Sequence, residues 1–204
     1  MASKERLIIG LDLGQQYDYT VLTAISAVFV SKRDMRYKLE YIHRYPLKMS
    51  YPDMGASVTR FMNSAKVKLH NPILIVDYTG VGAPVYDILI KNGLAPVGLT
   101  VTGGLSVNIT NRYKIAVPKR DLVASLQIVI QNKKIVIPSS LKEYAQLVAE
   151  VQNFSMDVTK GSSPTFNALR DNVHDDIIMS LCMATWYAED MLSGKKSPFI
   201  ATGI

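Results

Sequence analysis

The sequence of 204 residues contains a single cysteine, Cys182. One thiol excludes an internal disulfide and a cysteine-rich zinc site. No apolar run reaches the roughly 18 residues that a membrane-spanning helix needs, and residues 1–6 lack the apolar stretch of a signal peptide. From these absences we expect a soluble, intracellular protein that does not bind a membrane.

Nucleotide-binding and repeat signatures are also missing. The pattern G-x-x-x-x-G-K-[ST] does not occur, which excludes binding of a nucleoside triphosphate by a P-loop. We find no internal repeat, low-complexity tract or inter-domain linker. With 48% hydrophobic residues the chain can build a sizeable core, and we expect one domain that spans 1–204.

Basic side chains outnumber acidic ones by 23 to 17, which gives a formal net charge of +6. Five of the acids, Asp12, Asp18, Asp77, Asp175 and Asp176, belong to motifs that we expect to converge. Outside that group 12 acidic side chains remain, so the rest of the protein carries an excess of 11 positive charges. A basic surface around an acidic pocket favours a polyanionic ligand.

Four of these acids border apolar segments. Asp12 and Asp77 each follow a short apolar run directly, whereas Asp175 and Asp176 precede a long apolar segment. An unpaired carboxylate at a buried strand end costs several kcal/mol, which a divalent cation offsets. The helix dipole favours acids at a helix start by about 0.3 to 1 kcal/mol, but this does not explain Asp77. Together they predict an oxygen-only site for Mg²⁺ or Mn²⁺.

The first half of the chain predicts a mixed sheet. Three β-branched or alternating segments joined by short polar turns indicate an antiparallel meander. Helix-linked strands follow, which indicates parallel pairing. The expected elements are strands at 6–14, 20–30 and 36–47, a helix at 53–67 that begins near Pro52, a strand at 73–77, a helix that ends near 93 and a strand at 94–101.

The second half is less regular. Residues 103–117 alternate polar and apolar side chains, which is typical of a loop or a hairpin. The other expected elements are a helix at 118–131, a strand at 134–137, a helix from a cap at Ser140 to 151, a hairpin at 154–169 and a final helix from a cap at Asn172 to Leu192.

Four motifs occur in a fixed order along nearly the whole chain. They are IIGLDLG at 8–14, IVDYTGVG at 75–82, PKRDLV at 118–123 and HDD at 174–176. In this order they resemble the nuclease domain of a bacteriophage terminase large subunit. The resemblance implies an RNase H-like fold, which RuvC-type resolvases and retroviral integrases share: a mixed sheet flanked by helices, here with an added hairpin.

The resemblance also implies catalytic roles for the acids. Asp12 corresponds to the aspartate that bridges two divalent metal ions, Mg²⁺ or Mn²⁺, and Asp77 to the acid that ends the fourth strand. Asp175 and Asp176 match the paired acids of the last helix. Adjacent helical residues point about 100° apart, so one of the two is expected to bind metal directly. Asp18 is a candidate for a further ligand.

The same resemblance implies a viral DNA endonuclease that cuts concatemeric genomes during packaging by two-metal hydrolysis. Its expected partners are double-stranded DNA, a packaging ATPase domain, the portal and the small terminase subunit, in the cytoplasm of an infected bacterium. We expect the isolated domain to be monomeric. His174 is a candidate for orienting a carboxylate or water, and the cations near the expected hairpin are candidate DNA contacts: Arg112, Lys114, Lys119 and Arg120.

Other functions remain open at this stage. A RuvC-type Holliday-junction resolvase would use the same acids on a different substrate. A catalytically silent RNase H-like DNA-binding module is expected to lack one of the acids, and all are present here. An actin-type or sugar-kinase-type ATPase shares the first strand and its turn but needs two duplicated halves, for which this chain is too short.

Overall fold

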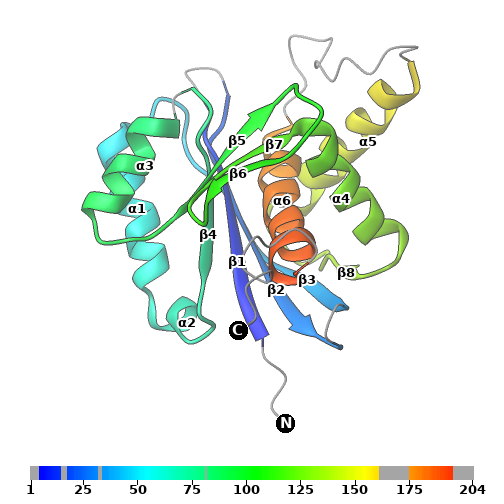
Figure 1. Ribbon diagram of the computed structural model, residues 1–204, viewed down its shortest axis with the longest axis horizontal. Helices are drawn as coiled ribbons and strands as arrows, with labels where there is room; N and C mark the ends of the chain where they lie inside the picture. The colour runs from blue at the N-terminus through cyan, green and yellow to red at the C-terminus, as the bar shows by residue number, and fades with distance from the viewer. Residues whose placement is uncertain (1–4, 15–17, 32–33, 81, 161–174, 195–204) are drawn as a thin grey trace.

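Eight strands form one mixed β-sheet in the computed structural model, which describes residues 5–14, 18–31, 34–80, 82–160 and 175–194. The strands lie in the order β6-β7-β5-β4-β1-β2-β3-β8, with helices on both faces (Figure 1). The predicted α/β class is therefore confirmed. The strands are β1 (Glu5–Asp12), β2 (Val21–Phe29), β3 (Met35–Arg44), β4 (Ile73–Asp77), β5 (Val97–Thr102), β6 (Asn108–Asn111), β7 (Lys114–Pro118) and β8 (Ile135–Val136).

The first three strands form the antiparallel meander that the sequence predicts. β1 pairs with β2 along its whole length, from Glu5 opposite Val28 to Asp12 opposite Val21. Both strands are almost wholly buried because helices cover the sheet on its two faces. Such burial explains their continuous apolar runs. β3 alternates buried and exposed residues over its first half, as a strand with one face in solvent does.

The strands on the other side of β1 are parallel. β4 pairs with β1, β5 with β4, and β7 with β5, all in parallel register. The carboxyl ends of these strands therefore meet at one edge of the sheet, the place where open α/β sheets bind ligands.

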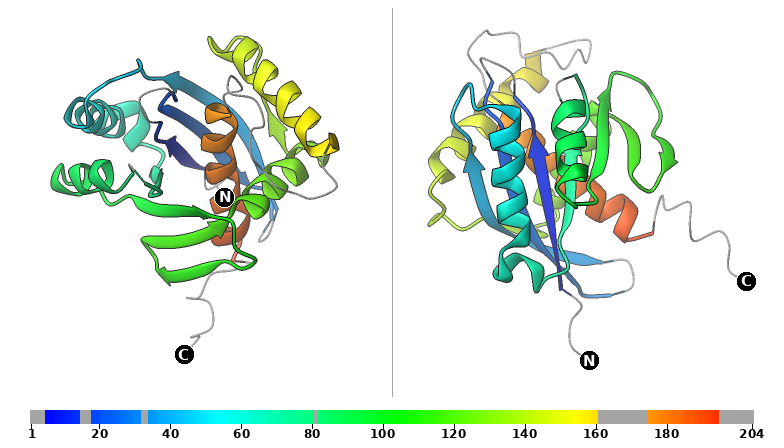
Figure 2. Two further views of the ribbon diagram at one scale, coloured as in Figure 1. Left: turned by 90° about the horizontal axis from the view of Figure 1, so that it is seen from above. Right: turned by 90° about the vertical axis from the view of Figure 1, so that its left-hand side faces the viewer.

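The helices form two layers, one on each face of the sheet (Figures 1 and 2). Ser50 caps the first helix by accepting a hydrogen bond from the Asp53 amide at 3.2 Å, and Pro52 lies in the first turn, as predicted. One layer contains α1 (Tyr51–Asn63), α2 (Ala65–Lys68) and α3 (Gly82–Lys91), and the other contains α4 (Lys119–Gln131), α5 (Tyr144–Lys160) and α6 (Asp176–Trp186).

The last helix lies at the centre of the second layer. Every residue of α6 is buried, and it packs across β1 and β2. Trp186 is fully enclosed. The helix continues as a π-helical turn, η1 (Tyr187–Leu192). In the described parts of the chain, no helix is both long enough and apolar enough to cross a membrane.

The added hairpin is formed by β6 and β7, which pair in antiparallel register at residues 108–118. The hairpin predicted at 154–169 is wrong over its first part, because α5 continues to Lys160; the rest of it lies outside the described residues. The predicted start of this helix at Ser140 is also wrong, since α5 begins at Tyr144. The core-facing side of α5 includes Leu147, Glu150 and Phe154 at helical spacing. Because one of the three is a glutamate, the apolar pattern of this helix is incomplete in the sequence.

Candidate metal centre

Asp12 and Asp77 end two neighbouring parallel strands. Leu11 of β1 pairs with Val76 of β4, so the next residue on each strand is one of the two aspartates. Because the strands are parallel, both carboxylates lie at the same edge of the sheet. The sequence pattern of an apolar run that ends in aspartate thus places two acids side by side.

A glycine in β1 fixes how closely α6 approaches these acids. A Cβ atom on Gly10 would lie 2.0 Å from the backbone oxygen of Ser180 on α6, so only glycine fits there. The Ser180 hydroxyl donates a hydrogen bond to the Gly10 oxygen at 2.9 Å and accepts one from the Thr23 amide at 3.1 Å. Strand and helix are therefore held together at one point in the core.

The same contact brings Asp176 to the level of Asp12. Two strand residues rise about 6.6 Å from Gly10 to Asp12. Four helix residues span about 6 Å from Ser180 back to Asp176. Because α6 runs opposite to β1, both steps lead to the same end of the sheet (Figure 1). The helix start and the strand ends therefore converge.

The electrostatics of Asp12 confirm that the carboxylates lie close together. Burial holds the pKa of Asp12 well above its usual value, and the charges of Asp77, Asp176 and Asp175 raise it further. Lys119 acts in the opposite direction. In the described part of the chain, one cation thus faces four acidic groups, and the ionised form of Asp12 is disfavoured.

Asp77 is held by the turn that follows its strand. Its Oδ1 accepts a hydrogen bond from the Thr79 amide at 2.8 Å. Burial raises the pKa of Asp77, whereas hydrogen bonds from Thr79 and from the Asp12 carboxyl oppose that rise. The Thr79 amide thus fixes one oxygen of Asp77 at the strand end.

The two acids of α6 have different partners. Asp175 occupies the N-cap position, and its Oδ2 accepts a hydrogen bond from Lys119 Nζ at 3.0 Å. Asp176 is 6% exposed, and its Oδ2 accepts a hydrogen bond from the Tyr19 amide at 3.3 Å. Both carboxylates act on Asp12, so both belong to the cluster.

Glu150 is a further acid that the sequence did not single out. It lies on α5, is 2% exposed, and accepts hydrogen bonds from the amides of Ile177 and Ile178 at 3.0 and 3.3 Å. Burial raises the pKa of Glu150 to about 7; Asp176 adds to this rise, and the two amides oppose it. The sequence feature that could have identified Glu150 is a glutamate at a core-facing position of an amphipathic helix.

No protein-family model and no curated protein matches this sequence. Solved structures do match. The large terminase nuclease of the thermophilic phage G20c has a TM-score of 0.54 at 17% identity, over 91% of this chain and 82% of that one. The human cytomegalovirus terminase nuclease domain has a TM-score of 0.55 at 12% identity, over 94% and 86%. The large terminase nuclease domain of bacteriophage SPP1, with bound Mn, has a TM-score of 0.50 at 12% identity, over 91% and 87%.

The fold is that of the terminase nucleases. It confirms the RNase H-like architecture expected from the four sequence motifs. At identities of 12% to 17% the likeness concerns the fold, so the chemistry of this chain has to be judged from its own side chains.

Of the two other predicted site residues, the structure describes one. Asp18 is exposed and lines a cavity of about 740 Å³ with residues 46–51, which connect β3 to α1. His174 lies outside the described residues. Their predicted roles, as a further ligand and as an orienting group, remain predictions.

The predicted DNA-binding cations fall into two groups in this terminase-type fold. Arg112 and Lys114 lie on the β6–β7 hairpin, where Arg112 covers the Tyr113 ring and Lys114 lies 4.8 Å from the centre of the Tyr78 ring. Lys119 lies at the start of α4 beside Asp175, and Arg120 donates a hydrogen bond to the Leu105 oxygen at 2.6 Å. Lys119 is thus part of the carboxylate cluster.

The cluster suits a hard divalent cation in the type and position of its ligands. Its four aspartates supply only oxygen atoms, which Mg²⁺ and Mn²⁺ prefer. Among the described residues, no group of three or more His, Cys, Asp and Glu side chains is already arranged to hold a metal ion. The reason lies in α6, where Asp175 is turned to Lys119 and Asp176 to the Tyr19 amide. These two contacts would have to yield for the acids to close around a cation.

Proposed function

We propose that this chain is a metal-dependent DNA endonuclease that cuts concatemeric viral DNA during genome packaging. The observation that carries the proposal is the convergence of Asp12, Asp77, Asp175 and Asp176 at one edge of a terminase-type fold. The charges of Asp77, Asp176 and Asp175 all raise the pKa of Asp12. A structural role gives no reason to collect four acids around one lysine, because such a cluster destabilises the fold.

Asp12 and Asp77 would hold two divalent ions, with Asp176 or Asp175 completing the ligand set from α6. Manganese bound in the related nuclease domain of bacteriophage SPP1 supports this choice of ion. When bound, such ions supply a water of lowered pKa and positive charge beside the leaving 3′ oxygen of a phosphodiester. No covalent intermediate with the protein is needed.

The remaining residues orient the acids and the DNA. The Thr79 amide fixes one oxygen of Asp77. Arg112, Lys114 and Arg120 would contact the phosphate backbone and position the duplex without reading its sequence. In an infected bacterium the partners would be a packaging ATPase domain, the portal and the small terminase subunit.

A plasmid cleavage assay tests the proposal. With Mn²⁺ or Mg²⁺ the protein should nick and linearise supercoiled DNA with little sequence preference, and excess EDTA should stop it. Ca²⁺ should support DNA binding with little turnover, because its looser coordination positions water and phosphate less well. Cleavage that continues in EDTA contradicts the metal mechanism.

Two controls sharpen this assay. Asp77→Asn should abolish cleavage, whereas Asp87→Asn, on the exposed side of α3, should leave it unchanged. Four-way junctions and linear duplexes of equal length should be compared in parallel. Equal or better cutting of the duplex supports a packaging nuclease, and symmetrical cutting of the junction alone supports a resolvase.

A further inference from the structure

The start of α6 is capped in an unusual way. An aspartate at the N-cap commonly accepts a hydrogen bond from an amide two or three residues further on. Asp175 occupies that position but makes no such side-chain bond, and its carboxylate is paired with Lys119 at 3.0 Å instead. The free amides of the first helical turn therefore need another acceptor.

Glu150 of α5 supplies that acceptor from outside the helix. Its Oε2 accepts hydrogen bonds from the amides of Ile177 and Ile178 at 3.0 and 3.3 Å. The side chain is 2% exposed, so water does not compete for these amides. An acid from a neighbouring helix thus does what the N-cap residue usually does.

We infer that Glu150 is a positioning residue, which caps α6 in place of Asp175 and so leaves the Asp175 and Asp176 carboxylates available to the catalytic cluster. This inference rests on the proposed function. Without Glu150, the N-cap residue Asp175 would be the usual acceptor for the open amides, and its carboxylate would turn away from the cluster. The first turn of α6 would then present the acids less accurately.

The rival explanation is that Glu150 only fastens α5 to α6. Leu147 provides the matched control, because it lies one turn earlier on α5, is also 2% exposed, and packs into the same core. Leu147→Ala should loosen that packing without touching the amides of α6. The comparison therefore separates capping from packing.

The experiment measures Mn²⁺ affinity by calorimetry, and kcat and KM for plasmid cleavage, well below the melting temperature of each variant. Glu150→Ala should weaken Mn²⁺ binding and lower kcat by about 10- to 100-fold, the usual effect of losing a group that orients a ligand. KM for DNA should stay unchanged. Glu150→Gln keeps an acceptor oxygen at the same reach and should remain within about threefold of the original protein.

Glu150→Asp provides a second route if the alanine variant does not fold. It keeps the charge but is one methylene too short to reach both amides, so it should lose Mn²⁺ affinity as the alanine variant does. Faster hydrogen exchange at the amides of residues 177–178 should accompany that loss.

Several results overturn the inference. They are unchanged Mn²⁺ affinity in both the alanine and the aspartate variants, an equal loss in Leu147→Ala, or a glutamine variant as defective as alanine. Failure of the proposed function looks different, because the unmodified protein would then neither bind Mn²⁺ nor cleave DNA.

Discussion

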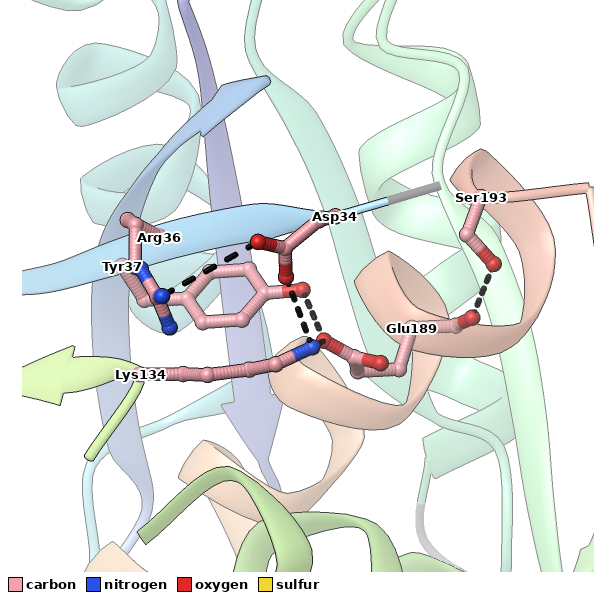
Figure 3. Close-up of polar contacts among 6 residues, drawn as sticks. All are labelled: Asp34, Arg36, Tyr37, Lys134, Glu189 and Ser193. Carbon is pink, nitrogen blue, oxygen red and sulfur yellow. Dashed lines mark hydrogen bonds and ion pairs between the residues drawn. The ribbon is translucent and has the colours of Figure 1, made fainter. Parts of the chain in front are cut away.

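The two ends of the last helix both carry acids, but only one end neutralises them. At the far end, Glu189 of η1 is 5% exposed and accepts hydrogen bonds from Tyr37 at 2.7 Å and from Lys134 at 3.4 Å. Lys134 also pairs with Asp34 at 3.1 Å, and Arg36 lies beside the same carboxylate (Figure 3). Asp34 and Glu189 are thus each paired with a cation, and Glu189 also with a hydroxyl.

The near end has the opposite balance. Among the described residues, Asp12, Asp77, Asp175 and Asp176 face one lysine. The effect on proton affinity differs in sign, since Lys134 lowers the pKa of Asp34 whereas burial and neighbouring acids raise the pKa of Asp12. At the far end, ion pairs stabilise the fold. At the near end, the carboxylates repel one another, and a bound cation would reduce that repulsion.

The largest effect is expected from Asp12→Asn, which should lower cleavage by at least about 10³-fold, several kcal/mol of transition-state stabilisation. The same change should raise the melting temperature of the metal-free protein by roughly 2 to 8 °C, for about 1 to 2 kcal/mol, because the amide removes a disfavoured charge. A plasmid assay measures the cleavage rate, and calorimetry measures the melting temperature. If both the melting temperature and the cleavage rate fell, Asp12 would have a structural role.

Lys134→Met should give the reverse pattern. Glu189 would lose its cation, and breaking this largely buried pair costs about 3 kcal/mol. The exposed Asp34 would lose the same partner. Urea unfolding measures this loss. Cleavage at a temperature where the variant is folded should match the original protein. If cleavage were lost first, the two ends of the helix would be coupled, and their separation into structural and catalytic acids would be wrong.

A pH series on metal-free protein sharpens the contrast. The folded-state pKa of Glu150, about 7 against an ordinary value of 4.5, is raised. Its stabilising contribution is therefore complete below pH 4.5 and is lost as pH rises toward 7. At about 1.4 kcal/mol per pKa unit, the loss is at most about 3 kcal/mol. Glu150→Gln should remove this contribution to the pH dependence. Urea unfolding of both proteins between pH 4.5 and 7 measures it. If the two curves of unfolding free energy against pH were parallel, the prediction would be contradicted.

Lys119→Met tests whether this lysine belongs to the metal site or to the DNA surface. Since Lys119 occupies Asp175 and repels a cation, its removal should strengthen Mn²⁺ binding by about five- to tenfold, roughly 1 kcal/mol at this partial exposure. Lys114→Met on the hairpin is the matched control and should leave Mn²⁺ affinity unchanged. Calorimetric titration of each variant with Mn²⁺ measures this affinity. Weaker Mn²⁺ binding in Lys119→Met would mean that the lysine organises the acids.

The smallest effect is expected from Arg112→Ala combined with Lys114→Ala. Each lost phosphate contact should reduce the slope of log affinity against log salt by about 0.9 for duplex DNA. Fluorescence anisotropy in Ca²⁺ measures the slope, and Mn²⁺ affinity should not change. If cleavage disappears at saturating DNA while the slope stays the same, the hairpin takes part in the chemistry.

Sequence patterns were enough for the parts of this protein that depend on local chemistry. Continuous apolar runs predicted β1, β2 and β4 because both faces of the sheet are covered, and aspartates at strand ends predicted the carboxylates of Asp12 and Asp77. A helix was correctly predicted at α5, but its bounds were wrong, and the role of Glu150 was not recognised. A buried acid is interpretable only when its partners, the amides of another helix, are known.

The sequence by itself determined the mixed α/β fold, the position of each acid at the end of its segment, and the order of four motifs. Only the tertiary structure decided how these ends meet. The contact between Gly10 and Ser180 joins residues 170 positions apart and sets the height of α6 against β1. Lys119 and Glu150 acquire their roles through partners 56 and 27 positions away. Secondary structure follows from periodic patterns of neighbouring residues, whereas the balance of charge at a site depends on the packing of segments far apart in the chain.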